Sequence, residues 1–324
     1  MKKLFLALFL LFAAGCCAFA LPSDFRLRAM GNADASDSGD SSVVFYNPAS
    51  LYFHNTDDFL NVHVTLSDYH ESGEGTKGPF LPGGDFHARF AGKFLSFTGS
   101  IMTQSSRRNQ HYDSIRTFSA DVSATAGWND FISAGIGLNA GLSAEREGFL
   151  VSDSNRLMDF LLNMVAAEYR RVDDSEYAVV RTGVQIAYGG FRLGVLAPFV
   201  YTYSEGDGFF SSSGLSAGIS YKGNKYHGRA RLNSFVVSAL AEVHNLLGET
   251  KTIHLGAELT VNISSSNEVS VRAGYESMLS DFGSGSLTLG ASAGMGKFEI
   301  GAFTEIDIND PESVEYSVEL VFRY

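Results

Sequence analysis

From residue 59 onward, apolar and polar residues alternate along the chain in segments of about 10 residues, the length of a tilted membrane-spanning β-strand. The clearest segment is the last one, residues 314–324. Its apolar positions share one face, and its charged and small polar positions share the other. The apolar set is Val314, Tyr316, Val318, Leu320, Phe322 and Tyr324, and the polar set is Glu315, Ser317, Glu319 and Arg323. Alternation with a period of two predicts a strand with one apolar face.

The same alternation recurs in residues 132–142, 253–263, 269–276 and 298–307. Charged residues take the face opposite the apolar residues in each segment. An Arg or Lys at the middle of a lipid-facing surface costs about 2–4 kcal/mol, so we assign the charged face to a lumen. The predicted strands are 59–69, 84–91, 94–104, 115–127, 131–145, 176–188, 191–204, 212–222, 226–237, 251–263, 267–278, 284–295, 297–308 and 314–324.

This pattern predicts an all-β protein, a transmembrane antiparallel β-barrel of about 14 strands. A soluble sheet buried on one face would alternate in the same way. The links between strands favour the barrel, because tight links alternate with mostly longer ones. The tight links are near residues 91–93, 128–130, 189–190, 223–224, 264–266 and 296. Short turns of such barrels face the periplasm, so both chain ends are expected there.

The amino-acid composition argues against two classes of protein, those that cross a membrane with helices and those that bind nucleic acids. The chain has 324 residues, with 34 Gly, 26 Phe and 14 Tyr, and no apolar run after residue 20 approaches the ~20 residues of a membrane helix. A net charge of −12 argues against nucleic-acid binding, which favours a basic surface.

Residues 1–20 have the features of a secretory signal peptide. Lys2 and Lys3 precede an apolar stretch from Leu4 to Ala14, and Ala18-Phe19-Ala20 forms an A-x-A cleavage site. The alternative is a lipoprotein-type site that ends at Cys16. If the signal peptide is removed after Ala20, Cys16 and Cys17 leave with it, and no disulfide or thiolate metal site is available to the mature chain.

Residues 26–51 lie between this signal and the first strand, and are rich in Gly, Ala, Ser and Asp. The segment contains Arg28-Ala29-Met30-Gly31 and ends in Asn47-Pro48-Ala49 followed by Leu51. It resembles the N-terminal plug of FadL-type outer-membrane transporters for long-chain fatty acids and other hydrophobic compounds. The resemblance implies a plug (hatch) at 21–58 inside the lumen, between the signal peptide predicted at 1–20 and the barrel predicted at 59–324. The alternative is a flexible leader with an ordinary Asn-Pro turn.

The resemblance also assigns candidate residues. It implies a plug or gate role for Arg28, Gly31, Asn47, Pro48 and Ala49. The terminal aromatic Tyr324 resembles the C-terminal signal read by the barrel-assembly machinery. The third outward loop of the family carries helices that capture ligand, and its third strand is kinked; here Gly99 lies in the corresponding strand.

The longest loop, residues 146–175, contains one helical pattern at residues 155–170. Its apolar residues recur along one side of the predicted helix. Five of them are candidate ligand-binding residues: Leu157, Phe160, Leu161, Met164 and Val165. The other interpretation is a helix that seals the barrel mouth.

Several basic residues occupy alternate strand positions on the charged face, which we assigned to the lumen. Among them are Arg181, Arg272, Arg229 and Arg231. A lumen cation could hold a fatty-acid carboxylate through charge-assisted hydrogen bonds, and we select Arg229 and Arg231 as candidates. The alternative for each arginine is a salt bridge with acidic residues of the wall or the plug.

No enzyme signature such as G-x-S-x-G, H-E-x-x-H or a P-loop occurs, so neither catalysis nor a cofactor is expected. We expect a protein of the cell outer membrane that transports long-chain fatty acids or similar hydrophobic molecules. Its expected partners are outer-membrane lipids and the hydrophobic ligand. The alternative is a structural barrel or surface adhesin that transports nothing.

Overall fold

The computed structural model describes residues 25–33, 35–36, 47–53, 60–70, 82–91, 94–108, 111–149, 170–204, 207–211, 214–223, 226–227, 234–264, 266–311 and 314–323. The described residues include two short helices, α2 (Phe25–Arg28) and the 3₁₀ helix η2 (Pro48–Phe53), ahead of 16 strands in one sheet. The predicted signal peptide at 1–20 lies outside the described residues. Within the described part of the chain, no helix is long and apolar enough to span a membrane.

The strands follow one another as an antiparallel series. They are β1 (Leu60–His70), β2 (Pro82–Ala91), β3 (Leu95–Arg108), β4 (His111–Trp128), β5 (Ile132–Phe149), β6 (Arg170–Tyr188), β7 (Phe191–Ser204), β8 (Asp207–Ser211), β9 (Ser216–Lys222), β10 (Tyr226–His227), β11 (Ser234–His244), β12 (Thr252–Asn262), β13 (Asn267–Met278), β14 (Asp281–Met295), β15 (Phe298–Asp307) and β16 (Val314–Arg323).

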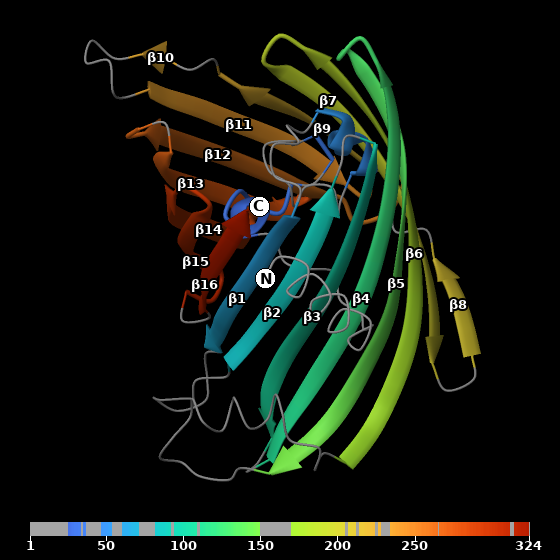
Figure 1. Ribbon diagram of the computed structural model, residues 1–324. Coiled ribbons are helices and arrows are strands. Elements are labelled where there is room, and N and C mark those ends of the chain that lie inside the picture. The colour runs from blue at the N-terminus through green and yellow to red at the C-terminus, as the bar shows by residue number, and fades with distance from the viewer. Residues whose placement is uncertain are drawn as a thin grey trace, which may run out of the picture.

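Pairing runs from β1 to β7 and from β11 to β16, and β16 pairs with β1. Strand β9 pairs with β7 on one side and with β11 on the other, so the order of pairing returns to β1. Figure 1 shows the strongly curved sheet that results, with α2 and η2 within its curve. Strand β8, of five residues, and β10, of two, extend β7 and β11. They raise the count above the predicted ~14.

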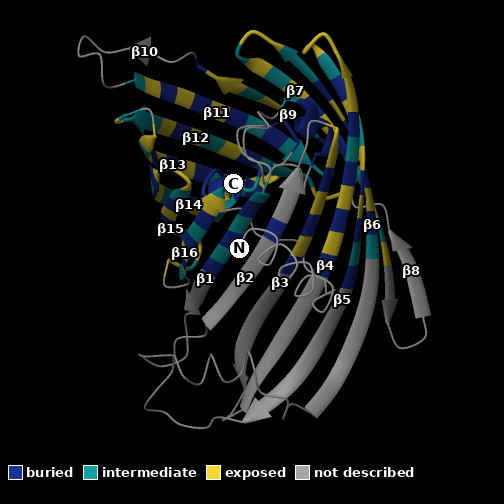
Figure 2. Ribbon diagram, in the orientation of Figure 1, coloured by how far each residue is buried: buried dark blue, intermediate teal, exposed yellow. Residues whose placement is uncertain are grey.

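The exposure of the side chains confirms the prediction that apolar residues occupy one face of the strands and polar residues the other. On β16, Tyr316 and Val318 are 55% and 45% exposed, whereas Ser317 and Glu319 are 3% and 5% exposed. Figure 2 shows the same alternation on strands that are coloured by burial, such as β11 and the upper parts of β4 and β5. The buried polar face points toward the N-terminal segment, and we call it the inner face. The exposed apolar face is the outer face.

The prediction of a strand at 226–237 is wrong, because β11 is Ser234–His244. Lys222 pairs with Ser238 and His227 with Ser234, so β9 and β10 both pair with β11 rather than with each other. The prediction failed because it assumed that apolar residues face outward. On β11, Val236 and Leu240 are buried on the inner face. Arg229 and Arg231 lie outside the described residues.

Most tight links occur where predicted. Gly189 and Gly296 adopt φ values of 61° and 63° in two of them. Such left-handed conformations suit glycine. The alternation of link lengths is incomplete, since only Leu279 and Ser280 separate β13 from β14 at the opposite end of the sheet. Strand β3 pairs with β2 and β4 through Gly99 without a register shift, so there is no β-bulge at Gly99.

Candidate functional site: the N-terminal segment on the inner face

The N-terminal segment, residues 25–36 and 47–53 as far as they are described, lies against the inner face. It reverses direction after α2, where Asn32 N donates to Leu27 O at 2.8 Å. Gly31 and Asn32 adopt φ values of 79° and 58°, which permits this tight turn. Leu27 is 1% exposed and Met30 is fully buried, so the turn is enclosed by the sheet rather than displayed on its surface.

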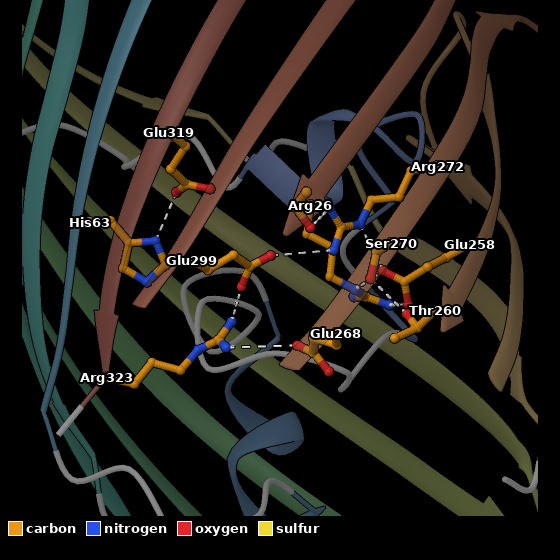
Figure 3. Close-up of polar contacts among 11 residues, drawn as sticks. Arg26, His63, Glu258, Thr260, Glu268, Ser270, Arg272, Glu299, Glu319 and Arg323 are labelled. Atoms are coloured by element: carbon orange, nitrogen blue, oxygen red, sulfur yellow. Dashed lines mark hydrogen bonds and ion pairs between the residues drawn. The ribbon is translucent and has the colours of Figure 1, made fainter. Parts of the chain in front are cut away.

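A chain of buried ion pairs attaches the start of the segment to the sheet (Figure 3). Arg26 donates to both carboxylate oxygens of Glu258 on β12, at 2.9 and 3.2 Å. Arg272 on β13 donates to the same carboxylate at 2.7 Å. All three residues are at most 7% exposed. A buried ion pair requires good geometry to offset its desolvation, and the two-point contact of Arg26 supplies it.

The chain of ion pairs continues across the neighbouring strands. Arg272 lies 3.8 Å from Glu299 on β15, and Arg323 on β16 donates to Glu299 and lies 4.0 Å from Glu268. The wall charges near the segment are therefore paired with one another as well as with the segment.

Arg28 makes a second set of contacts. Its guanidinium lies 2.6 Å from Glu315 and 3.6 Å from Glu305, and 4.7 Å from the centre of the Phe303 ring. The cation therefore has both carboxylate partners and an aromatic face. These contacts fix the segment to β15 and β16.

The next part of the segment is held through its backbone. Glu242 on β11, which is 1% exposed, accepts hydrogen bonds from Ala35 N at 2.8 Å and Ser36 N at 2.7 Å. His254 Nδ1 donates to Gly31 O at 2.6 Å, because a carbonyl oxygen can only accept. A buried carboxylate thus satisfies backbone groups that water cannot reach.

Asn47-Pro48-Ala49 opens η2 on the opposite part of the sheet. Asn47 Oδ1 accepts from Ala49 N at 3.0 Å, an N-cap hydrogen bond, and Asn47 Nδ2 donates to Ala35 O at 2.5 Å. Ser133 Oγ on β5 donates to Ala49 O at 2.9 Å. The asparagine side chain therefore connects the two parts of the segment, and the wall holds the resulting turn.

Glycines on the inner face allow this backbone to approach the wall. A Cβ atom at Gly135 would lie 2.5 Å from Pro48 C and 2.6 Å from Ala49 N. A Cβ atom at Gly183 would collide with the Asn47 side chain, and one at Gly194 with Ala35. Only glycine fits where two backbones come this close.

The structure thus places all five residues on the inner face in two groups, Arg28 and Gly31 against β12, β13, β15 and β16, and Asn47, Pro48 and Ala49 against β5 and β6. Only Arg170 of the predicted capture helix at 155–170 is described, and it begins strand β6 rather than ending a helix. Leu157, Phe160, Leu161, Met164 and Val165 lie outside the described residues. Arg181 and Arg272 are buried on the inner face, as parity predicted. Both form salt bridges, Arg181 with Asp121 and Arg272 with Glu258.

Sequence reasoning missed Arg26, Glu242, Glu258 and the glycines of the inner face. Three of these could have been recognised, because they lie on the predicted lumen face of strands that were predicted: Glu258, Gly135 and Gly183. Glu242 could not, since its strand was not predicted.

No protein-family model matches the sequence, and no curated protein matches it significantly. Solved structures do match its fold. The monoaromatic hydrocarbon channel CymD matches with a TM-score of 0.57 and 12% identity, over 92% of this chain and 97% of that one. The Ralstonia pickettii toluene transporter TbuX gives 0.53 and 13%, over 92% and 97%. A Pseudomonas aeruginosa FadL homologue gives 0.50 and 12%, over 94% and 99%.

At these identities the likeness is one of fold. The resemblance to FadL-type transporters is confirmed at that level, and these matches extend over nearly the whole of each protein. The chain therefore shares the fold of these channels and transporters of hydrophobic compounds, and it carries an N-terminal segment bound to its inner face.

Proposed function

We propose that the chain is a closed barrel of the cell outer membrane that passes hydrophobic compounds, with residues 21–58 as its plug and residues 59–324 as its wall. One observation carries the proposal. The described residues of the N-terminal segment form no strand and are buried on the polar inner face of the curved sheet, while the outer face of that sheet is apolar. This inside-out distribution suits a wall between lipid and an obstructed lumen.

The outer face supports a membrane location. Trp128, Tyr188 and Phe191 are 67%, 79% and 52% exposed beside the tight links of the sheet, where an aromatic girdle would meet the membrane interface. Strand β12 has 11 residues, within the ~9–11 that a tilted membrane strand needs. Exposed apolar surface of this extent would favour aggregation in water.

The cargo class rests on the shared fold and on the plug. The matching proteins are described as channels for aromatic hydrocarbons or toluene and as a FadL homologue. For this chain we propose long-chain fatty acids or similar molecules, whose apolar chains gain about 0.8 kcal/mol per buried CH₂. An open polar pore would have no need of a plug. We propose no catalytic step.

Two ligand contacts from the sequence belong to the same proposal. The first is capture at the mouth by Leu157, Phe160, Leu161, Met164 and Val165. The second is orientation of an anionic head group by Arg229 and Arg231.

Uptake by proteoliposomes tests the proposal. Vesicles that contain the purified protein should accumulate radiolabelled oleate or toluene faster than vesicles with a closed barrel of similar size, and should exclude labelled sucrose. A structural barrel or adhesin would give equal, slow uptake of all three compounds, which would refute transport.

A further inference from the structure

Two histidines of the wall lie beside the turn of the N-terminal segment. His244 ends β11, and His254 is near the start of β12. Their rings stack, with 3.8 Å between the ring centres and 24° between the ring planes. Leu279 N donates to Lys251 O, so the pair is near the same end of the sheet as the β13–β14 link. Because the chain ends are expected in the periplasm, this end would face outside.

The hydrogen bonds of His254 fit a neutral ring. Its Nδ1 donates to Gly31 O at 2.6 Å, so in a neutral imidazole its Nε2 accepts from Thr252 Oγ1 at 2.9 Å. The side chain of His254 is 4% exposed. Both ring nitrogens therefore have partners without a charge, and little water reaches the ring to solvate one.

His244 connects the pair to a second contact of the segment. Its Nε2 donates to Glu242 Oε2 at 3.3 Å, because a carboxylate can only accept. The same carboxylate accepts from Ala35 N, Ser36 N and the Ser36 hydroxyl at 2.8, 2.7 and 2.6 Å. The side chain of His244 is 19% exposed, so protons from water reach the pair through it.

Two described carboxylates face the pair. Glu242 is on β11, and Glu276 on β13 lies 3.6 Å from His254 Nδ1. Glu276 also accepts from Asn32 Nδ2 at 2.9 Å, and its side chain is 33% exposed, so water screens its attraction for a charge on His254. From β9 no charge faces the site, because the residue against Glu242 there is Gly218.

Protonation of both rings is opposed while the segment is bound. Two imidazolium ions stacked at 3.8 Å repel each other, and the enclosed ring of His254 has almost no water to weaken the repulsion. If the segment left the wall, this ring would be hydrated. Glu242 would lose its hydrogen bonds from the segment and would pair with a charged histidine instead. The detached state therefore takes up protons more readily than the bound state, and acid favours detachment.

We propose that the His244–His254 pair is a pH-sensitive switch, which holds the N-terminal segment on the wall at neutral pH and releases it in mild acid. The bound state is fully stabilised where both rings are neutral, and it loses stability as the pH falls below about 6.5, where an exposed histidine becomes charged. The inference rests on the proposed function in one respect, since release opens the lumen only if the segment is the plug.

Cysteine labelling of the purified protein in detergent tests the switch. Cys16 and Cys17 are changed to serine, and the fully buried Ala33 to cysteine. The maleimide labelling rate is divided by that of Ser266→Cys, an exposed position, at the same pH, because thiol reactivity depends on pH. Between pH 7.5 and 5.5, where carboxylates stay ionised, the normalised rate should rise about tenfold, as for one histidine that is charged only in the detached state.

A double variant, His244→Gln with His254→Asn, keeps a hydrogen-bond donor at both positions but cannot become charged. Its normalised rate should change less than about twofold over the same pH range. His63→Asn is the matched control, because His63 is also a buried histidine bonded to a glutamate, Glu319, but lies on β1. It should keep the tenfold rise. If the double variant does not fold, His254→Asn alone should abolish most of the rise.

A normalised rate that does not rise in acid, or that rises equally in the folded histidine variants, would overturn the inference. The labelling needs neither a bilayer nor cargo, so this outcome is distinct from failure of the transport proposal, which proteoliposome uptake by the unaltered protein measures. Release in acid without uptake at any pH would refute transport and leave the switch standing.

Discussion

A single methyl group at Gly183 should release the N-terminal segment. The Cβ of Gly183→Ala would collide with Asn47 Oδ1 and would lie 2.8 Å from Asn47 Cγ. Asn47 is fully buried, so its side chain has no free space to enter. Overpacking of this kind costs about 1–3 kcal/mol. The wall on its outer face is not affected, because the added methyl group points inward.

The displaced asparagine would also lose its hydrogen bonds to Ala49 N and Ala35 O. Each contributes about 0.5–1.5 kcal/mol. The bound state of the segment should therefore lose at least about 2 kcal/mol, which raises the detached population roughly 30-fold. Gly99→Ala is the matched control, because a Cβ there meets nothing within 4 Å.

A cysteine in place of Ser50, which is 1% exposed in η2, reports detachment. With Cys16 and Cys17 changed to serine, the labelling rate with a maleimide measures how often the segment leaves the wall. Gly183→Ala should raise that rate roughly 30-fold, and Gly99→Ala should leave it unchanged. Equal rates in the two variants would refute the close approach of Asn47 to the wall.

Three further predictions follow from the ion pairs and from the proposed roles of the chain ends and loops. Glu258→Gln leaves Arg26 and Arg272 without their shared carboxylate and should lower the free energy of unfolding in guanidinium by about 3–5 kcal/mol. Glu249→Gln, at an exposed position, should leave that free energy unchanged, and equal stability of the two variants would contradict the buried network. The mature chain should begin at Leu21, and an intact mass that starts at a lipidated Cys16 would contradict this. Leu161→Asp with Val165→Asp should slow oleate uptake in cells while heat-modifiable gel mobility stays normal; normal uptake would leave the helix as a lid.

The strands could be predicted because alternation is a local property of the sequence. Residues 191–204 and 267–278 coincide with β7 and β13, since apolar side chains such as Leu193, Val195 and Val271 recur on the outer face, although Leu196 of β7 is buried on the inner face. Strand β11 could not be found in this way. Leu240 faces inward because Met30 and Ala33 of the N-terminal segment cover it, and this contact depends on residues more than 200 positions away.

The site was predictable only in part for the same reason. Gly31 and Asn47-Pro48 could be singled out through the resemblance to FadL-type plugs, and a turn at Asn47-Pro48 also follows from local backbone chemistry. The partners of the segment could not. Arg26 contacts Glu258 across 232 positions of the sequence, and Glu242 contacts Ala35 across 207. Long-range pairing of this kind has no local signature in one sequence.

Conductance of single barrels in planar bilayers tests the central claim most directly. The claim is that the N-terminal segment obstructs the lumen of a membrane-spanning barrel. The unaltered protein should insert and conduct little or no current. A variant that lacks residues 26–51 should conduct in steps of uniform size. Equal conductance with and without these residues would contradict the account.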